Sequence, residues 1–287
     1  MSGPQSLTRN ALKRLPLPAL EAACDKESRG HVLVLAGSSE VPGGALLTAL
    51  ASMRAGAGKL TIATPASVAI PLAIAIPEAR VIALPESKTG LLRLTPALAK
   101  MCEGVDAAII GPGMLDKTAT RRITLAALPL LTHATVVLDA MALAAAGPKP
   151  FRQPVIMTPH AGEMAHLMRT TKDEIEADPH YAAHHAAQRW NACVALKGAV
   201  TYVVEGQGAC WRHTSHQPGL ATSGSGDILC GIAGGLAARG AAPLRAILWA
   251  VVAHSLAGKR LSKQVGEVGY LARELLGEIP AVLRAAR

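Results

Sequence analysis

The segment Gly224-Ser225-Gly226-Asp227 holds the residue types best suited to chemistry, because it runs directly into an apolar stretch typical of a helix. Glycines let the backbone approach a ligand closely, and the unpaired N–H groups at a helix start attract anions. The same partial positive charge stabilises a carboxylate, so Asp227 is predicted to be ionised and available as a base. A helix-capping role for Asp227 explains the same residues equally well.

Several other polar or glycine-containing segments directly follow apolar runs that are typical of buried strands. They are Gly37-Ser38-Ser39, Gly111-Pro112-Gly113, Asp139, 158–163 and Lys197-Gly198. Ligands bind beyond the carboxyl ends of the strands in open parallel sheets, so these segments are candidates for one shared site. Lys197 fits either a phosphate contact or a strand-terminal charge, and His160 fits either a ligand contact or a residue beside a helix cap.

The elements that would position these segments alternate between strand and helix. Apolar runs predict strands at 31–36, 59–63, 80–84, 105–111, 134–139, 154–157, 193–197 and 200–205, and a further strand after Gly206 that would close a hairpin. Helices are predicted near 44–55, 66–75, 95–103, 117–130, 161–169, 172–191, 225–239, 243–260 and 268–286. This alternation predicts an α/β fold with a mostly parallel sheet, in which 1–28 form a leader and 29–287 a single domain.

Composition favours the same fold class and excludes several functions. Hydrophobic residues make up 50% of the chain and aromatic residues only 2%, so small aliphatic side chains must fill the core of a sheet covered on both faces. The net charge of +9 comes from scattered basic residues, which suits phosphate-bearing small molecules better than nucleic acid. No apolar run approaches the roughly 18 residues that a membrane span needs. The five dispersed cysteines and the lack of a secretion signal predict reduced thiols in a cytoplasmic protein.

The histidines and the common nucleotide motifs give weaker signals. His180 and His184 lie one helical turn apart and His185 adjoins them, which is one arrangement of metal ligands. Without an H-E-x-x-H carboxylate or a cysteine partner nearby in sequence, a solvated helix face is the favoured interpretation. The P-loop, the G-x-G-x-x-G dinucleotide fingerprint and the G-x-S-x-G nucleophile elbow are absent.

Taken in chain order, the candidate segments resemble the ADP- or ATP-dependent NAD(P)H-hydrate dehydratases of the ribokinase-like superfamily. Each motif is short, and the specificity lies in the ordered set, which covers nearly the whole chain. The set comprises 34–38 (VLAGS), 44–45 (GA), 54–58 (RAGAG), 111–113 (GPG), 137–140 (VLDA), 158–163 (TPHAGE), 196–199 (LKGA) with Thr201, and 224–227 (GSGD).

The resemblance implies a ribokinase-like three-layer α/β/α sandwich that uses ADP or ATP, with Mg²⁺, to dehydrate the S epimer of hydrated NADH or NADPH. Asp227 would be the catalytic base, and the hydrated dinucleotide would contact Ala45, Gly113, His160 and Asp227. The adenine nucleotide would bind Lys197, Gly198, Ala199, Val200, Thr201, Gly224, Ser225 and Gly226. Relatives also imply a homo-oligomer, specifically a tetramer, and a separate epimerase protein. The resemblance leaves the metal ligands undefined.

Two departures from the family pattern keep other functions open. The family often has an aromatic residue where Glu40-Val41-Pro42 stands, and a second aspartate where Met141 stands. One alternative is a ribokinase-like small-molecule kinase that phosphorylates a hydroxymethyl group and releases a stable phosphorylated product. The other is a non-catalytic nucleotide-binding module.

Overall fold

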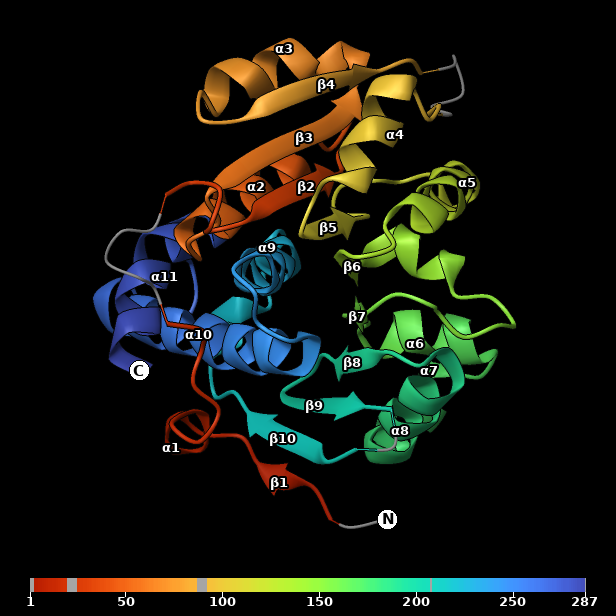
Figure 1. Cartoon of the computed structure of the whole chain (residues 1–287). Helices are drawn as coiled ribbons and strands as arrows, with labels where there is room; N and C mark the ends of the chain where they lie inside the picture. The colour runs from red at the N-terminus through yellow and green to blue at the C-terminus, as the bar shows by residue number, and fades with distance from the viewer. Residues whose placement is uncertain (1–2, 20–24, 87–91, 207, 287) are drawn as a thin grey trace.

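A ten-stranded sheet forms the centre of the computed structural model, which describes residues 3–19, 25–86, 92–206 and 208–286 (Figure 1). Across the sheet the strand order is β1-β10-β9-β8-β7-β6-β5-β2-β3-β4. Strand β9 is antiparallel to β8 and β10, and the other neighbours pair in parallel. The strands are β1 (Gln5–Ser6), β2 (His31–Leu35), β3 (Lys59–Pro65), β4 (Arg80–Leu84), β5 (Ala107–Ile110), β6 (Thr135–Leu138), β7 (Val155–Met157), β8 (Cys193–Leu196), β9 (Val200–Glu205) and β10 (Cys210–Thr214).

Helices cover both faces of the sheet and form two separate hydrophobic cores. Within β2, Val32 and Val34 point into one core while Leu33 and Leu35 point into the other, as the two-residue period of a strand requires. The first core contains residues of α1 (Arg9–Leu12), α2 (Gly43–Arg54), α3 (Ala66–Ala75), α9 (Ser225–Ala238), α10 (Pro243–Gln264) and α11 (Ala272–Ala286). The second contains residues of α4 (Pro96–Glu103), α5 (Lys117–Ala127), α6 (Ala161–Met168), α7 (Lys172–Ala177) and α8 (Pro179–Trp190). The predicted three-layer α/β/α sandwich is confirmed.

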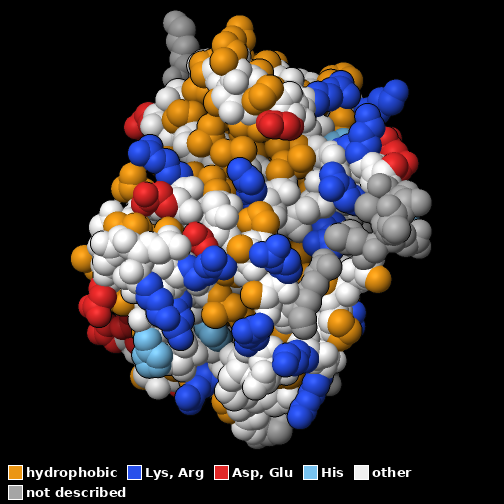
Figure 2. All heavy atoms as spheres, turned by 90° about the vertical axis from the view of Figure 1, so that its left-hand side faces the viewer, with side chains coloured by type: hydrophobic (Ala, Val, Ile, Leu, Met, Phe, Trp, Pro, Cys, Tyr) orange, Lys and Arg blue, Asp and Glu red, His pale blue; other side chains and the backbone are white. Residues whose placement is uncertain are grey.

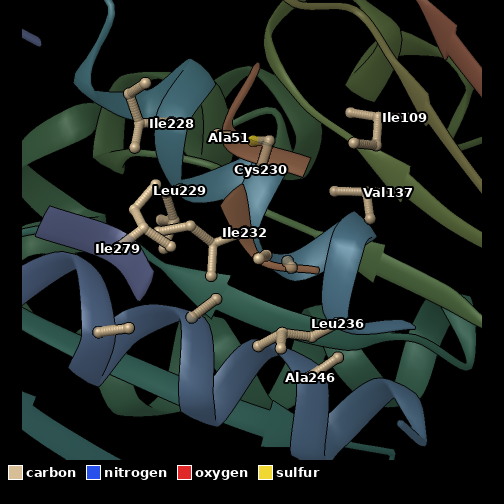
Figure 3. Packing of buried hydrophobic residues seen from close by; sticks show 14 of the residues in the cluster. Ala51, Ile109, Val137, Ile228, Leu229, Cys230, Ile232, Leu236, Ala246 and Ile279 are labelled. Atoms are coloured by element: carbon tan, nitrogen blue, oxygen red, sulfur yellow. The ribbon is translucent and has the colours of Figure 1, made fainter. Parts of the chain in front are cut away.

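Helix α9, which begins with the Gly-Ser-Gly-Asp segment, is held firmly in the first core. Figure 3 shows it between Ile109 and Val137 of the sheet and the helices α10 and α11. A Cβ at Gly231 would lie 2.5 Å from Thr48 O, and one at Gly235 would lie 2.4 Å from Ser52 O, so only glycine lets α2 pack this closely. The first turn of α9 is therefore fixed relative to α2 and to the sheet.

Most predicted elements agree with the structure to within a few residues, and the hairpin of β9 and β10 is confirmed. The predicted helix at 172–191 is wrong, because the chain breaks between α7 and α8 at Asp178, which precedes Pro179 and caps α8 through Tyr181 N. Short 3-10 helices at Leu128–Leu130, Ala140–Ala145 and Pro218–Leu220 were not predicted.

The N-terminal segment packs more closely than a simple leader suggests. Strand β1, which was not predicted, pairs with β10, and the following Leu7 and Leu12 are buried. The indole of Trp249 donates a hydrogen bond to Leu15 O at 2.7 Å. The division of the chain into 1–28 and 29–287 stays a prediction.

The basic side chains, the helices and the cysteines can be compared with what the composition predicted. Lys and Arg side chains are spread over the face shown in Figure 2, among hydrophobic and other side chains. No helix in the described ranges is both long and apolar enough to cross a bilayer. The described cysteines Cys102, Cys193, Cys210 and Cys230 are free and buried, and Cys24 lies outside the described residues.

The interpretation of 180–185 as a solvated helix face is wrong for His184. Its side chain is only 7% exposed, because α8 packs on β9 and turns this residue toward the sheet. A cysteine that is distant in sequence, Cys210 at the start of β10, lies beside His180 and His184.

Candidate active site

The carboxyl ends of three adjacent strands place a buried ion pair at the centre of the predicted site. Lys197, directly after β8, lies 2.9 Å from Asp139 Oδ1, directly after β6. Between them in the sheet, β7 leads to Thr158, whose hydroxyl donates to the same oxygen at 2.6 Å. The parallel order of β6, β7 and β8 thus makes neighbours of side chains that are 58 positions apart in sequence.

The charges of this pair stabilise each other. Burial alone would raise the pKa of Asp139, but the Lys197 ammonium and the hydrogen bond from Thr158 hold it below its usual value. Burial alone would lower the pKa of Lys197, and the Asp139 carboxylate raises it instead. Lys197 therefore remains a fixed positive charge. Its side chain is 21% exposed.

His160 sits at the N-terminus of α6 beside this pair. Its Nδ1 accepts hydrogen bonds from Gly162 N and Glu163 N, at 3.0 and 3.3 Å. In return Glu163 Oε2 accepts from His160 N at 2.8 Å, which completes a capping box, and it lies 3.9 Å from Lys197 Nζ. The cap interpretation of His160 is thus confirmed for Nδ1, while its exposed side chain still lines the cavity described below.

The first turn of α9 lies against Lys197. Gly224 is the N-cap residue with φ of +87°, a conformation that favours glycine, and no side chain caps this helix. The capping alternative for Asp227 is therefore wrong. A Cβ at Gly226 would lie 3.4 Å from Lys197 Nζ and 3.9 Å from Asp139 Oδ2, so the first turn of α9 lies close to the ammonium. The Ser225 N–H is already bonded, to Thr222 O at 3.2 Å.

Asp227 is half-buried in this first turn, and its acidity differs from the prediction. Burial raises the pKa of Asp227 to about 6, and the nearby Asp139 charge adds to the shift while Lys197 opposes it. The helix-dipole argument predicted the opposite direction, because it took no account of desolvation or of the second carboxylate. The carboxyl group is still mostly ionised at neutral pH, with a pKa close to the value that suits a general base.

A cavity of about 680 Å³ opens beside these groups. It is bounded by the segment between β8 and β9, the end of β10, the 3-10 helix Pro218–Leu220, the start of α9 and the middle of α10. The predicted residues that line it are His160, Lys197, Gly198, Ala199, Thr201, Ser225 and Gly226. Its volume and mostly apolar wall, with a lysine at one end, suit a nucleotide whose base lies in the cavity and whose phosphates reach the α9 N-terminus.

Histidine 254 on α10 completes one wall of the cavity and was missed by the sequence analysis. Its Nε2 lies 2.9 Å from the hydroxyl of Ser225 in the first turn of α9. Burial lowers the pKa of His254 to about 4, so the ring is neutral at physiological pH. Only the packing of α10 on α9 brings the two residues together, and no motif in the sequence marks it.

A second group of predicted residues lies where the loops after β2 and β5 meet, next to the N-terminus of α2. A Cβ at Gly44 would lie 2.5 Å from Gly113 N, and Gly113 has φ of +68°. Gly37 N donates to Pro112 O at 2.8 Å, which ties the two loops together. Ala45 follows Gly44 and is buried. Strands β2 and β5 flank the point where the strand order reverses, which is a preferred ligand position in such sheets.

Asp227 connects the two groups. Its carbonyl accepts a hydrogen bond from Thr48 on α2 at 3.2 Å, one helical turn after Ala45, while a Cβ on the preceding Gly226 would lie 3.4 Å from Lys197 Nζ. Five predicted residues do not line the cavity: Ala45, Gly113, Val200, Gly224 and Asp227. The residues that line it without having been predicted include His213, Ser215, His216, Gln217, Leu220 and His254. Met141 is 37% exposed in the 3-10 helix after β6.

The sheet order and the strand-end site define a ribokinase-like protein. A ribokinase-like superfamily protein from Enterococcus faecalis superposes with a TM-score of 0.85 over 100% of this chain and 97% of its own, at 24% identity. Residues 32–281 match the NAD(P)H-hydrate dehydratase family, and the chain belongs to this family.

Two relatives cover the whole chain. The ADP-dependent (S)-NAD(P)H-hydrate dehydratase of Xanthomonas campestris is 45% identical over 99% of this chain and 98% of its own. The crystal structure of the ADP/ATP-dependent NAD(P)H-hydrate dehydratase of Bacillus subtilis, co-crystallised with ATP and Mg²⁺, matches at a TM-score of 0.85 and 30% identity, with full coverage of both chains.

Proposed function

We propose that this chain dehydrates the S epimer of hydrated NADH or NADPH at the expense of ADP or ATP. In the first step the ring hydroxyl oxygen bonds to the terminal phosphorus of the nucleotide, while the bond from that phosphorus to its bridging oxygen breaks. In the second step the ring C–O bond breaks as phosphate leaves, and loss of a ring proton restores the double bond. The position of Asp227 between the two groups of predicted residues carries the proposal.

Asp227 is the base that accepts the hydroxyl proton. The N–H groups of Gly224 and Gly226 face the phosphoryl group in transfer, and Lys197 balances its negative charge. The Ser225 N–H already donates to Thr222 O, so Ser225 contributes its position in the first turn of α9. The cavity residues Gly198, Ala199 and Thr201 hold the adenine nucleotide, and Val200 joins them in the chain. The hydrated dinucleotide occupies the β2–β5 side, where Ala45 and Gly113 lie, and reaches His160 with its ring end near Asp227.

Magnesium fits this site as a partner of the nucleotide. In the described ranges no three carboxylate, histidine or cysteine side chains gather around Asp227, and Asp139 is already bonded to Lys197 and Thr158. Phosphate oxygens and water would therefore fill most of the coordination shell, which is how Mg²⁺ commonly binds, with Glu163 as a single protein ligand. The ion would screen the phosphate charges, and activity measured across a Mg²⁺ titration tests this.

Recovery of the reduced-nicotinamide absorbance from hydrated NADH, ADP or ATP and Mg²⁺ tests the function. We expect Asp227→Asn to lower kcat by roughly 10²- to 10⁴-fold, the usual contribution of a general base. In the unaltered protein, kcat/KM should fall as the pH decreases through about 6, because the protonated carboxyl cannot accept the hydroxyl proton. Calorimetry should show that the variant still binds ADP.

Other outcomes of the same assay distinguish the alternatives. A stable phosphorylated product would identify a small-molecule kinase, and tight nucleotide binding without turnover would identify a binding module. Either result, or no recovery with both nucleotides under conditions where the Bacillus subtilis enzyme works, overturns the proposal.

We further propose a cytoplasmic homo-oligomer that binds no nucleic acid. The buried free thiols fit a reducing compartment, and the basic side chains form no continuous stripe on the face shown in Figure 2. Ile70 and Ile74 on α3 are 72% and 75% exposed, which supports contact with another copy. Light scattering of the purified protein measures the oligomeric state, and a monomer would contradict the proposal.

A further inference from the structure

A cluster of two histidines and a cysteine lies away from the proposed active site. His180 and His184 are on the same face of α8, one turn apart, and Cys210 is the first residue of β10. Their potential ligand atoms all lie within 4.8 Å of one another. Figure 1 shows α8 beside the β9–β10 hairpin, and α8 packs directly on β9.

The cluster contains buried polar atoms that have no hydrogen-bond partner in the described part of the chain. His184 is 7% exposed, and neither of its ring nitrogens is bonded; Nε2 of His180 is also buried and unbonded. The two rings meet edge to face with centroids 4.8 Å apart, so the His184 ring is directed at its neighbour rather than at solvent. Buried polar groups are nearly always paired, and unpaired ones indicate a missing partner.

We propose that His180, His184 and Cys210 form a binding site for a borderline-soft transition-metal ion, with Zn²⁺ as the physiological class. Imidazole and thiolate are the ligands that Zn²⁺ prefers over Mg²⁺ or Ca²⁺. Zinc–nitrogen and zinc–sulfur bonds of about 2.0–2.3 Å place tetrahedral ligands roughly 3.3–3.8 Å apart. Side-chain rotations that move the ligand atoms by about 1 Å bring the observed separations to these values. His180 is half-buried, so a fourth coordination position is open to water.

Metal binding changes the protonation of the cysteine. Burial raises the pKa of Cys210 to about 11, so the thiol carries its proton in the metal-free protein. On binding, the S–H bond breaks, the proton passes to the solvent buffer, and the sulfur electron pair forms the bond to the ion. The imidazoles bind as neutral rings, and burial, with the neighbouring His180, already holds the pKa of His184 below its usual value.

The bound ion would join α8 to the hairpin at the edge of the sheet. Cys210 begins β10, and Ser215 directly after the other end of this strand lines the nucleotide cavity. The ion thus holds one end of a strand whose other end contributes to the cavity wall. It takes no part in the proposed phosphoryl transfer.

Cobalt titration of the full chain, stripped of metal and kept reduced, tests the site. Co²⁺ is a spectroscopic substitute for Zn²⁺, and we expect one equivalent to bind with a thiolate-to-cobalt charge-transfer band in the near ultraviolet. Addition of Zn²⁺ should remove the band by displacement. The absence of this band in the unaltered protein overturns the proposal.

Variants show whether these three residues are the ligands. Cys210→Ser should abolish the charge-transfer band, and His180→Asn and His184→Asn should each weaken binding by roughly 100-fold or more, since loss of an outer-shell partner alone costs 10- to 100-fold. The matched controls are Cys102→Ser, a buried cysteine on α4 whose pKa is also raised to about 11, and His185→Asn, the next residue on α8. Neither control should change the titration.

A persistent band in Cys210→Ser, or unchanged affinity in both histidine variants, rejects the site. Circular dichroism without metal establishes that each variant folds. If Cys210→Ser does not fold, His180→Asn decides, because this half-exposed residue tolerates substitution. Full-affinity Co²⁺ binding by the folded His180→Asn variant then overturns the proposal.

Discussion

Two buried polar clusters lie along the β6–β10 half of the sheet, and they differ in how their polar atoms are paired. In the cluster of Asp139, Thr158 and Lys197 the chain supplies every partner, at distances of 2.6 and 2.9 Å. In the cluster of His180, His184 and Cys210 the ring nitrogens of His184 have no partner in the described ranges. The first cluster is complete without a ligand, and the second is not.

Buried polar groups therefore have two different roles in this protein. A satisfied ion pair holds Lys197 in one position, so the charge at the end of the cavity is fixed before any nucleotide arrives. An unsatisfied pair of imidazoles lowers the stability of the metal-free fold and gains stability when an ion binds. Substitutions in the two clusters should therefore have opposite effects on stability.

The largest effect is expected from removing the carboxylate of the satisfied cluster. Asp139→Ala leaves the Lys197 ammonium without its main partner, and we expect the free energy of unfolding to fall by about 3 kcal/mol. The loss should lie at the low end for a broken buried pair, because Lys197 is 21% exposed and retains Glu163 at 3.9 Å. Urea unfolding at neutral pH measures it.

Thr158→Val is the matched control for this prediction. It removes the hydroxyl that donates to Asp139 and that also lies 3.3 Å from Leu138 O and from Cys230 Sγ. It keeps the ion pair, so it should cost about 1 kcal/mol. An equal loss in the two variants would mean that the ion pair contributes nothing beyond the hydrogen bond.

A smaller effect is expected from Asp227, a carboxyl beside the satisfied cluster that forms no ion pair with the described residues. Its pKa rises from 3.8 in an unperturbed aspartate to about 6, so folding favours the protonated form. Its stability contribution is therefore present below about pH 4 and is lost as the pH rises through 6. We expect Asp227→Asn to be more stable than the unaltered protein by about 2 to 3 kcal/mol at pH 8, although its kcat should be lower.

Urea unfolding of the unaltered protein and of Asp227→Asn between pH 4 and pH 8 tests the direction of this pH dependence. The stability difference should shrink as the pH falls from 8 to 4, because the unaltered carboxyl then becomes protonated and resembles the amide. A difference that does not change with pH would show that folding leaves the pKa of Asp227 unaltered.

The sequence placed Asp139, Thr158 and Lys197 at one sheet edge without predicting their ion pair, and it offered His180 and His184 as possible metal ligands without Cys210. Residues that follow parallel strands meet at one sheet edge, so Asp139, Thr158 and Lys197 could be grouped from strand positions alone. The sandwich followed from the alternation of strands and helices in the same way. The raised pKa of Asp227 could not be predicted, because it depends on burial and on the distance to Asp139.

The contacts that sequence analysis missed depend on helix packing. His254 reaches Ser225 because α10 packs on α9, and Cys210 reaches His184 because α8 packs on the hairpin. In each pair the residues come from elements whose relative placement no local pattern encodes. The split between α7 and α8 was predictable from Pro179 and was overlooked, because the helical periodicity continues across it.

The smallest changes in the free energy of unfolding are expected from substituting two buried histidines, His184 and His254. His254 has a partner in Ser225 at 2.9 Å, whereas His184 has none in the described ranges. In metal-free protein, His184→Leu should raise the free energy of unfolding by about 1 kcal/mol, because it replaces an unpaired buried imidazole with an apolar group of similar size. His254→Leu should lower it by a similar amount, because the Ser225 hydroxyl then loses its partner.

Repeating both measurements with saturating Zn²⁺ sharpens the comparison. The ion stabilises only a chain that retains its ligands, so the advantage of His184→Leu over the unaltered protein should disappear or reverse. His254→Leu should keep the same deficit with and without Zn²⁺, since Ser225 on α9 and His254 on α10 are not part of the His180–His184–Cys210 cluster. If metal-free His184→Leu is the less stable protein, the imidazole has a partner within the fold, and the unsatisfied character assigned to this cluster is wrong.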